Sequence, residues 1–206
     1  MRSPVLFLAL AGCGTAGALG QAHFSGQCAE SDAACTRRHP QAPIAVGARF
    51  FPDVELTIPG TSTPNLRLES ADPDVLAVED GALVAKAPGS TAVLVTTDDG
   101  SVVDFAQMWV ARPTSLTLAT RDGDRIVDQI SLAVGEDATL VPTLWAGAQR
   151  LGGAGALAWT ESTPSLAILR DGSADRRRIR ARAPGKTSIT VAIGDIETTL
   201  DVEVVP

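Results

Sequence analysis

The sequence predicts an all-β chain, folded as two tandem antiparallel β-sandwiches that follow a signal peptide and a flexible tether. Three observations lead to this class. From residue 44 onward, short runs of Val, Ile, Leu and Thr alternate with turn signals. No segment of ten or more residues carries the 3.6-residue period of an amphipathic helix. A set of motifs occurs twice in the same order, and strands without intervening helices are typical of sandwiches and barrels.

Two hairpins are marked by their turns. Residues 91–97 and 101–110 flank Asp98-Asp99-Gly100, and residues 188–193 and 196–205 flank Gly194-Asp195, a glycine-first pair suited to type II′ geometry. In the last run every second residue is apolar or Thr, from Ile196 to Val204, which predicts a strand with one buried face.

A repeat divides the chain into a first domain, residues 43–112, and a second, residues 113–206. Arg112-Pro113 lies between the copies, and Pro cannot donate within a central ladder, so the boundary falls there. The offset between copies grows along the chain, as expected for a duplicated domain whose loops have gained residues. The matching segments are Val46-Gly47 with Val134-Gly135 (offset 88), residues 73–75 with 164–166 and Asp80-Gly81 with Asp171-Gly172 (offset 91), and residues 85–91 with 181–187 (offset 96).

A run of motifs in the second copy carries a family resemblance. It reads Trp-Thr-Glu-Ser-Thr-Pro-Ser-Leu-Ala from Trp159, then an Asp-Gly turn, Ala-Pro-Gly-Lys-Thr at residues 183–187, and a closing Val/Ile hairpin. Residues 126–205 thereby resemble the bacterial immunoglobulin-like group 2 domain. The resemblance implies an immunoglobulin-like sandwich in which Trp159 is the core tryptophan, Pro164 and Leu166 form the turn and strand after it, and residues 183–185 form the next turn.

The first copy, residues 44–111, resembles the family more weakly. Leu68 stands where the second copy has its tryptophan, and the segment around Phe50-Phe51-Pro52 is irregular. Membership of the same broad class is the expectation for this copy, with its precise topology left open.

The N-terminus reads as an export signal. Arg2 precedes an apolar run, residues 5–11, which is too short to span a bilayer and is followed by small residues. Leu-Ala-Gly-Cys at residues 10–13 resembles the lipobox of bacterial lipoproteins, which implies a signal peptide over residues 1–12, lipid attachment at Cys13 and a membrane, favouring the outer membrane or cell surface, as partner. Ordinary cleavage after residues 18–20 would instead release a secreted protein, and a cytoplasmic protein with a chance apolar start is the third reading.

Residues 13–42 are predicted to be a tether, because they are rich in Gly, Ala, Ser and Gln and lack hydrophobic periodicity. Cys28 and Cys35 lie six residues apart within an exported chain, which favours a small disulfide loop; two free thiols are the alternative. A metal site would need more ligands than His23 and His39 add at this spacing.

Charge and composition exclude some partners. The formal net charge is −7, and residues 43–112 alone carry 4 basic and 10 acidic side chains. Because a general nucleic-acid binder needs a cationic face, we expect no nucleic-acid partner. Aromatic residues are only 4 % of the chain, which is thin for a carbohydrate-stacking surface.

The sequence predicts no enzyme and no cofactor. A Ser-His-Asp or Cys-His triad needs an imidazole, and both histidines fall in the tether. Carboxylate pairs occur at Glu79-Asp80, Asp98-Asp99 and Asp122-Gly-Asp124, each at a predicted turn, where Asp and Gly serve the backbone. Asp122 and Asp124 are weak candidates for a calcium site at the domain junction, and solvated turns are the favoured reading.

An arginine-rich segment is the remaining candidate for function. Read as a strand, residues 176–182 project Arg176, Arg178, Arg180 and Arg182 from one face, a cationic strip on an acidic protein. Guanidinium groups fit phosphate and carboxylate, so the strip could bind an unknown protein or an anionic surface polymer. The alternative is a charged edge strand that blocks aggregation.

Together these features predict a non-catalytic, lipid-anchored module of the bacterial cell envelope, with a binding, adhesion or spacer role. The family resemblance implies adhesion or surface display. Two alternatives stay open: a structural subunit of a larger envelope or secretion complex that uses its sheet edges, and a soluble secreted immunoglobulin-like protein.

Overall fold

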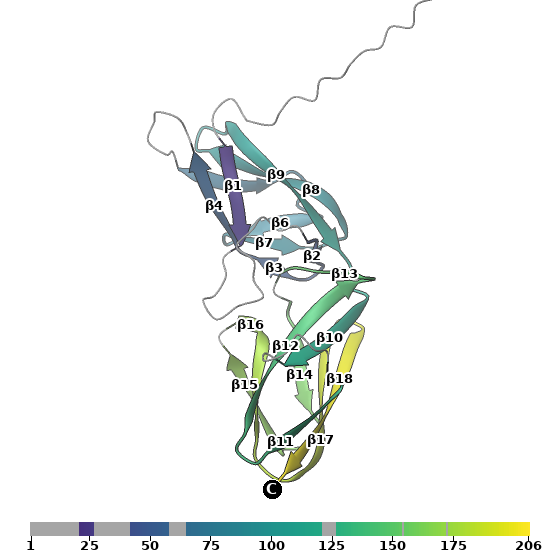
Figure 1. The fold of residues 1–206 in the computed structure, drawn as a ribbon. Coiled ribbons are helices and arrows are strands. Elements are labelled where there is room, and N and C mark those ends of the chain that lie inside the picture. The colour runs from purple at the N-terminus through teal and green to yellow at the C-terminus, as the bar shows by residue number, and fades with distance from the viewer. Residues whose placement is uncertain (1–20, 27–41, 58–64, 121–126, 154, 172) are drawn as a thin grey trace, which may run out of the picture.

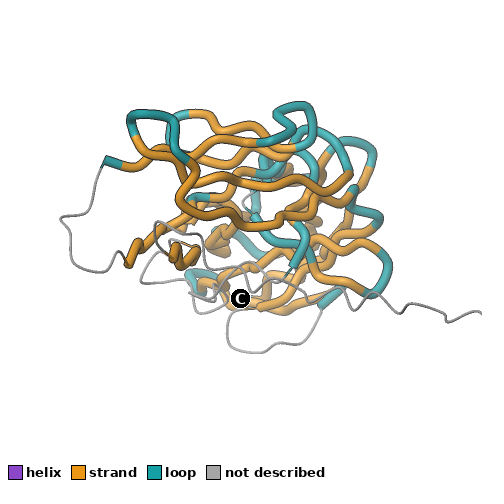
Figure 2. The backbone as a smooth tube through the Cα atoms, turned by 90° about the horizontal axis from the view of Figure 1, so that it is seen from above, coloured by secondary structure: helices purple, strands orange, loops and turns teal. Residues whose placement is uncertain are grey.

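The computed structural model describes residues 21–26, 42–57, 65–120, 127–153, 155–171 and 173–206. Within these ranges the chain forms strands and turns and no helix (Figure 2). Figure 1 shows the strands gathered into two bodies, one after the other along the chain. The all-β class with two tandem sandwiches is therefore confirmed.

The strands divide between two domains. Domain 1 holds β1 (Gln21–Gly26), β2 (Ile44–Ala45), β3 (Arg49–Phe50), β4 (Pro52–Thr57), β5 (Leu66–Ser70), β6 (Leu76–Glu79), β7 (Ala82–Ala85), β8 (Gly89–Thr97) and β9 (Val102–Ala111). Domain 2 holds β10 (Ser115–Thr120), β11 (Gln129–Ala133), β12 (Asp137–Ala146), β13 (Gln149–Arg150), β14 (Ala158–Glu161), β15 (Leu166–Asp171), β16 (Ser173–Ala181), β17 (Gly185–Ile193) and β18 (Ile196–Val205).

Domain 2 has the sheet order of an immunoglobulin-like sandwich. One sheet runs β10-β12-β16-β15, and the other runs β11-β18-β17-β14. With the short strands β11 and β13 set aside, these are the ABED and CFG sheets of a seven-strand immunoglobulin domain. Domain 1 repeats the arrangement as β2-β9-β8-β5 and β3-β7-β6, with β1 and β4 as a separate pair.

The duplication predicted from the motifs is visible in the hydrogen bonds. The Gly47 amide donates to the Ala85 carbonyl at 2.8 Å, and the Gly135 amide donates to the Ala181 carbonyl at 2.9 Å. Both glycines have φ above 80°, a left-handed conformation that favours glycine, and both end a short strand that runs parallel to the last strand of its domain. The Val-Gly motif therefore marks the point where the chain crosses between sheets.

One register differs from the motif alignment. The Val75 carbonyl accepts from the Lys86 amide, and the Ser165 carbonyl accepts from the Arg182 amide, so Val75 and Ser165 are equivalent. The offset here is 90 rather than the 91 obtained by aligning the prolines. Strand pairing confirms that Leu68 occupies the position of Trp159. Leu68 lies opposite Val95 in domain 1, and Trp159 lies opposite Val191 in domain 2.

Residues 21–26 correct the predicted extent of the tether. They form β1, which pairs antiparallel with β4 from Gln21 opposite Thr57 to Gly26 opposite Pro52. Phe24 is 3 % exposed and belongs to the hydrophobic core. In domain 2, β10 pairs with β12 in the register that β1 has with β4. β1 is therefore the first strand of domain 1, and this domain begins about twenty residues earlier than the composition suggested.

The irregular segment around Phe51 interrupts a strand. In domain 2, β12 is continuous over ten residues, whereas in domain 1 the equivalent strand breaks at Phe51 into β3 and β4. Phe51 is 45 % exposed, with the Arg49 guanidinium 6.0 Å from its ring centroid. The sequence irregularity therefore marks a real break, within the same topology.

Each sandwich is filled by aliphatic side chains from both sheets. Burial of each contributes about 1.5–3 kcal/mol relative to exposure. The largest fully buried side chains are Ile44, Leu76, Leu83, Met108, Val93 and Val95 in domain 1, and Leu118, Leu140, Leu166, Ile179, Ile189 and Leu200 in domain 2.

The two domains are joined by more than the linker. The Ala45 amide donates to the Gly152 carbonyl at 3.0 Å, and the Gly152 amide donates to the Pro43 carbonyl at 2.8 Å. The loop after β13 thus adds to the open edge of β2 as a parallel bridge. We call this contact, made by residues 43–45 and 152–153, the brace.

Candidate functional site

The arginine strip is only partly exposed. Arg178 and Arg180 have side chains 46 % and 50 % exposed, and Arg182 is exposed beyond the end of β16. Arg176 is 4 % exposed, so the predicted four-residue strip is corrected to three. β12 lies beside β16 only from Arg177 to Arg180, so Arg176 falls outside that ladder and does not share the surroundings of Arg178 and Arg180.

The strip is not on an edge strand. β16 lies between β12 and β15, and β15 is the strand at the end of the sheet. The explanation of the arginines as an edge that blocks aggregation is therefore wrong. The arginines instead stand on the outward face of the sheet, where Arg178 lies opposite Leu169 and Arg180 lies opposite Ala167.

Asp137 neutralises part of the strip. Arg180 donates from Nε and Nη2 to its two carboxylate oxygens at 2.6 and 2.8 Å, and Arg178 Nε lies 3.8 Å from Oδ2. The hydrogen bond from Arg180 is the largest cause that holds the pKa of Asp137 below 3.8; burial opposes it, and the charges of Arg180 and Arg178 reinforce it. One carboxylate faces two guanidinium groups, which leaves this face with a positive surplus.

Arg177 and Trp159 face each other between the sheets. The Arg177 guanidinium carbon lies 5.7 Å from the Trp159 ring centroid, a cation–π distance. Trp159 is partly buried against the core, and its indole N–H is buried without a hydrogen-bond partner. The expected core role of Trp159 fits this placement, and Arg177 lies on the opposite side of the strand from the strip.

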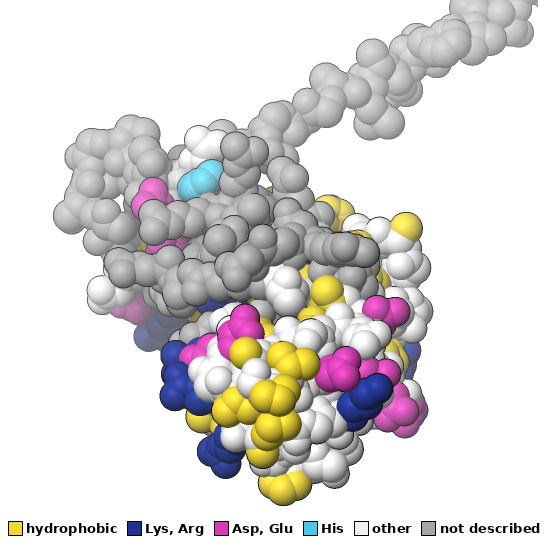
Figure 3. Space-filling model, turned by 60° about the horizontal axis from the view of Figure 1, so that its bottom comes forward, with side chains coloured by type: hydrophobic (Ala, Val, Ile, Leu, Met, Phe, Trp, Pro, Cys, Tyr) yellow, Lys and Arg dark blue, Asp and Glu magenta, His cyan; other side chains and the backbone are white. Residues whose placement is uncertain are grey.

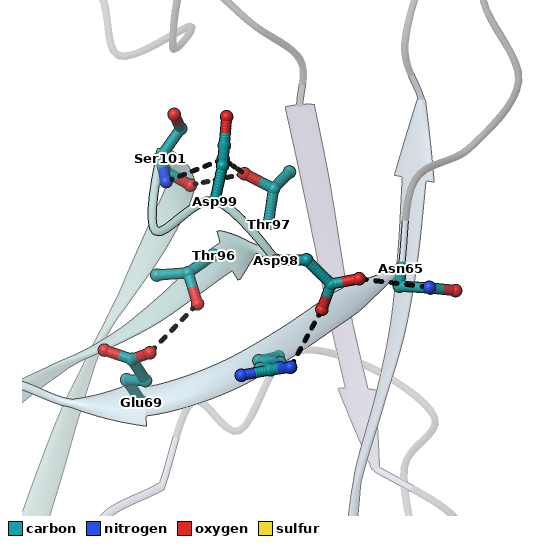
Figure 4. Close-up of polar contacts among 8 residues, drawn as sticks. Asn65, Glu69, Thr96, Thr97, Asp98, Asp99 and Ser101 are labelled. Carbon is teal, nitrogen blue, oxygen red and sulfur yellow. Dashed lines mark hydrogen bonds and ion pairs between the residues drawn. The ribbon is translucent and has the colours of Figure 1, made fainter.

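The carboxylates of the β8–β9 turn make hydrogen bonds and an ion pair that stabilise this turn and its contact with β5 (Figure 4). Asp98 accepts from Asn65 at 3.1 Å and pairs with Arg67 at 3.1 Å. Asp99 accepts from the Thr97 hydroxyl and the Ser101 amide, and these bonds lower its pKa below 3.8. This arrangement matches the reading of Asp98-Asp99 as a structural turn.

The free end of domain 2 carries exposed apolar side chains. Val134 and Val205 are 45 % and 39 % exposed, and Figure 3 shows hydrophobic side chains gathered at this end beside charged ones. The equivalent residues of domain 1, Val46 and Ala111, are only partly exposed next to the brace. The same corner of the fold is therefore covered in one domain and open in the other.

Several predicted site residues lie outside the described residues. These are the lipid-attachment candidate Cys13, the possible disulfide partners Cys28 and Cys35, and the calcium candidates Asp122 and Asp124. Among the described residues, no group of three or more His, Cys, Asp and Glu could hold a metal ion. In the same part of the chain, no helix is both long and apolar enough to cross a membrane.

Comparison with known proteins finds relatives only among solved structures. No protein-family model matches the chain, and no curated protein matches its sequence. The predicted membership of the group 2 family thus stays a prediction.

The similar structures include S-layer proteins, adhesins and an endo-fucoidan hydrolase of glycoside hydrolase family 107. Domains 4 and 5 of the S-layer protein SbsC are 22 % identical, cover 73 % of this chain and 82 % of theirs, and give a TM-score of 0.34. The Escherichia coli adhesin FdeC is 11 % identical (92 % of this chain, 65 % of that one, TM-score 0.37), and the bacterial integrin-binding protein invasin is 15 % identical (90 % and 40 %, TM-score 0.39). This chain thus spans less than half of the invasin chain. At such TM-scores these likenesses carry no functional argument, and the architecture stands on the sheet order: two tandem immunoglobulin-like sandwiches.

Proposed function

We propose that this chain is a non-catalytic, lipid-anchored module of the bacterial cell envelope, which holds its domains away from the membrane as one stiff unit. Cys13 would carry the lipid, and the exposed surfaces of the two sandwiches would meet partners. Adhesion or surface display is the role that this arrangement fits best.

The brace is the observation that supports a stiff unit. Domains joined only by a short linker usually move relative to one another. Here two backbone hydrogen bonds tie Gly152 of domain 2 to Pro43 and Ala45 of domain 1, and Thr114 in the linker donates its amide to the Trp145 carbonyl of domain 2 at 2.7 Å. The domains are thus joined at a second point besides the linker, which suits a spacer that must transmit position.

The test of anchoring uses metabolic labelling. Cells given a labelled fatty acid should incorporate it into the wild type and not into Cys13→Ala, while Cys28→Ala and Cys35→Ala should keep the label. An unlabelled wild type would contradict lipid anchoring and favour the secreted alternative. Protease treatment of intact cells then separates surface display, in which the domains are cleaved, from a periplasmic location.

The arginine strip supports a binding role for domain 2. Because Arg176 is buried, the informative change is Arg178→Ser with Arg182→Ser, which removes exposed charge and leaves the Arg180–Asp137 pair intact. If capture of an anionic polymer such as lipoteichoic acid or heparin persists in this variant, the strip is not the binding site, and the spacer role is favoured.

A further inference from the structure

The outward face of β8 and β9 in domain 1 is apolar and exposed. Phe105 and Trp109 are 51 % and 46 % exposed, and they alternate with the buried residues Ala106 and Met108. Leu94 lies directly opposite Phe105 on the neighbouring strand. We call this surface, made by Leu94, Phe105, Gln107 and Trp109, the aromatic face.

Domain 2 shows that the fold does not require aromatic residues there. The pair equivalent to Leu94 and Phe105 is Thr190 and Thr199, whose hydroxyl oxygens lie 3.3 Å apart. Trp109 corresponds to Glu203, which lies opposite Lys186. The same outward face is therefore polar in one copy and aromatic in the other, which is typical of a surface that meets a partner.

Charge limits which partner suits the aromatic face. Glu69 is exposed opposite Leu94, and the turn carboxylates Asp98 and Asp99 lie at the end of the same two strands. Asp104 lies on the other side of β9, where its carboxylate accepts from the Ala22 amide at 2.7 Å. Asp98 already pairs with Arg67, at 3.1 Å. Two such acidic faces would repel each other, so a matching surface must be apolar with a basic rim.

The outward face of β15 and β16 supplies the basic charge. Arg178 and Arg180 stand beside Leu169, which is partly exposed, and the single carboxylate of Asp137 leaves the surface with a positive surplus. Arginine side chains bind both carboxylates and aromatic rings. The chain thus carries an acidic aromatic surface on one domain and a basic surface around Leu169 on the other.

We propose that the aromatic face of one copy docks on the β15–β16 face of a second copy, head to tail. Phe105 and Trp109 then meet the arginine strip, and the carboxylates around them pair with its surplus charge. Such a contact uses two different surfaces, so it extends beyond a dimer, into a row of molecules or a closed ring. A contact of this small size and high charge is weak and salt-sensitive, with a Kd on the order of 100 µM.

The first experiment measures self-association by sedimentation velocity, using the full chain with Cys13→Ser to exclude the lipid. The weight-average sedimentation coefficient should rise between about 10 and 500 µM in low salt and fall back in about 0.5 M salt, where charges are screened. A chain that stays monomeric over this range overturns the proposal.

Variants then assign the surfaces. Phe105→Thr with Trp109→Glu gives domain 1 the residues that domain 2 carries at these positions. Arg178→Ser with Arg182→Ser removes two of the three exposed arginines and leaves the Arg180–Asp137 pair. Each double variant should be monomeric at every concentration. Phe51→Ser and Lys186→Ser, which remove an exposed aromatic and an exposed cation elsewhere, should associate like the wild type.

Mixing the two double variants gives the sharpest result. Each retains one intact surface, so the mixture should form a one-to-one dimer and no larger species. A mixture that stays monomeric, or association lost in only one of the two variants, overturns the head-to-tail contact. Unchanged far-ultraviolet circular dichroism and melting temperature in both variants separate these outcomes from misfolding.

Discussion

The backbone amide of Ala45 donates to the carbonyl of Gly152, and this bond joins domain 1 to domain 2 at 3.0 Å. In domain 2 the equivalent amide, that of Ala133, donates instead to the Glu136 carboxylate at 2.8 Å. The residue in domain 1 at the position of Glu136 is Ala48, which is fully buried. In domain 1 this strand edge is thus open to the neighbouring domain, whereas in domain 2 a side chain of the same domain fills the equivalent hydrogen bond.

Gly153 tests the brace. Its φ is +86°, and an added Cβ would lie 3.0 Å from Ala48 Cβ and from Ile44 Cγ2 and 3.3 Å from the Arg49 carbonyl. We expect Gly153→Ala to lower the free energy of unfolding by about 2–4 kcal/mol, from backbone strain and crowding together. Gly147→Ala is the control, because its φ is +59° and no atom lies within 4 Å. Urea denaturation that gives equal losses for the two variants would contradict a close-fitted brace.

A hydroxyl pair present in domain 2 is missing from domain 1. Ser162 and Thr187 share a hydrogen bond at 3.2 Å, whereas Thr91, at the position of Thr187, has a buried hydroxyl without a partner. The Ala71 amide donates to the Ala92 carbonyl, and the Ser162 amide donates to the Ser188 carbonyl, so Ala71 occupies the position of Ser162. Domain 1 therefore lacks the hydroxyl group that Ser162 supplies in domain 2.

We therefore expect Ala71→Ser to raise the free energy of unfolding of domain 1 by about 1 kcal/mol, because it gives Thr91 a partner. The gain should vanish when Thr91→Val is also present, and Ser162→Ala should cost domain 2 a similar amount. Chemical denaturation of the wild type, Ala71→Ser, Thr91→Val and the double variant completes the double-mutant cycle. A gain that persists without the Thr91 hydroxyl would show that another cause operates.

Asp137 predicts an acid-dependent stability. Its pKa in the folded chain is lowered from 3.8, chiefly by the hydrogen bond from Arg180, so its contribution is present above pH 3.8 and is lost as the pH falls through the lowered value. The stability difference between wild type and Asp137→Asn should shrink over that range, measured by urea denaturation at pH 2–6. Asp195→Asn, at the exposed β17–β18 turn, is the control. A difference that is constant with pH would contradict the assignment.

Two substitutions of Trp159 should differ in how much they lower the free energy of unfolding. Trp159→Phe keeps an aromatic ring under Arg177 and removes a buried N–H that has no partner, so its cost should stay below about 1 kcal/mol. Trp159→Ala removes the ring and should cost about 3 kcal/mol. Thermal denaturation that finds equal costs would mean that the indole nitrogen has a role that the packing does not explain.

Sequence reasoning succeeded where a motif depends on local backbone geometry. Gly194 has φ of +57° in the two-residue turn that the Gly194-Asp195 pair predicted, and the Val-Gly pairs end their strands in both copies. It failed where the outcome depends on a distant partner. β1 has only Ala22 and Phe24 on its core side, and its identity as a strand comes from pairing with β4, about thirty residues away.

The two surfaces show the same limit. Alternation along β16 could assign Arg178 and Arg180 to one face, and it could not reveal that Arg176 is buried. Along β9, Phe105 and Met108 are both apolar, so alternation could not tell which face was the core. Comparison of β9 with β18, its polar counterpart, was the signal in the sequence that could have found the aromatic face.

The measurement that tests the stiff two-domain unit most directly is backbone ¹⁵N relaxation on the chain with Cys13→Ser. One rotational diffusion tensor should describe the amides of both domains, and Gly153→Asp, which forces a charged side chain against Ala48 and Ile44, should split them into two. If the domains of the wild type already tumble independently, the brace does not hold in solution, and the proposed spacer role fails with it.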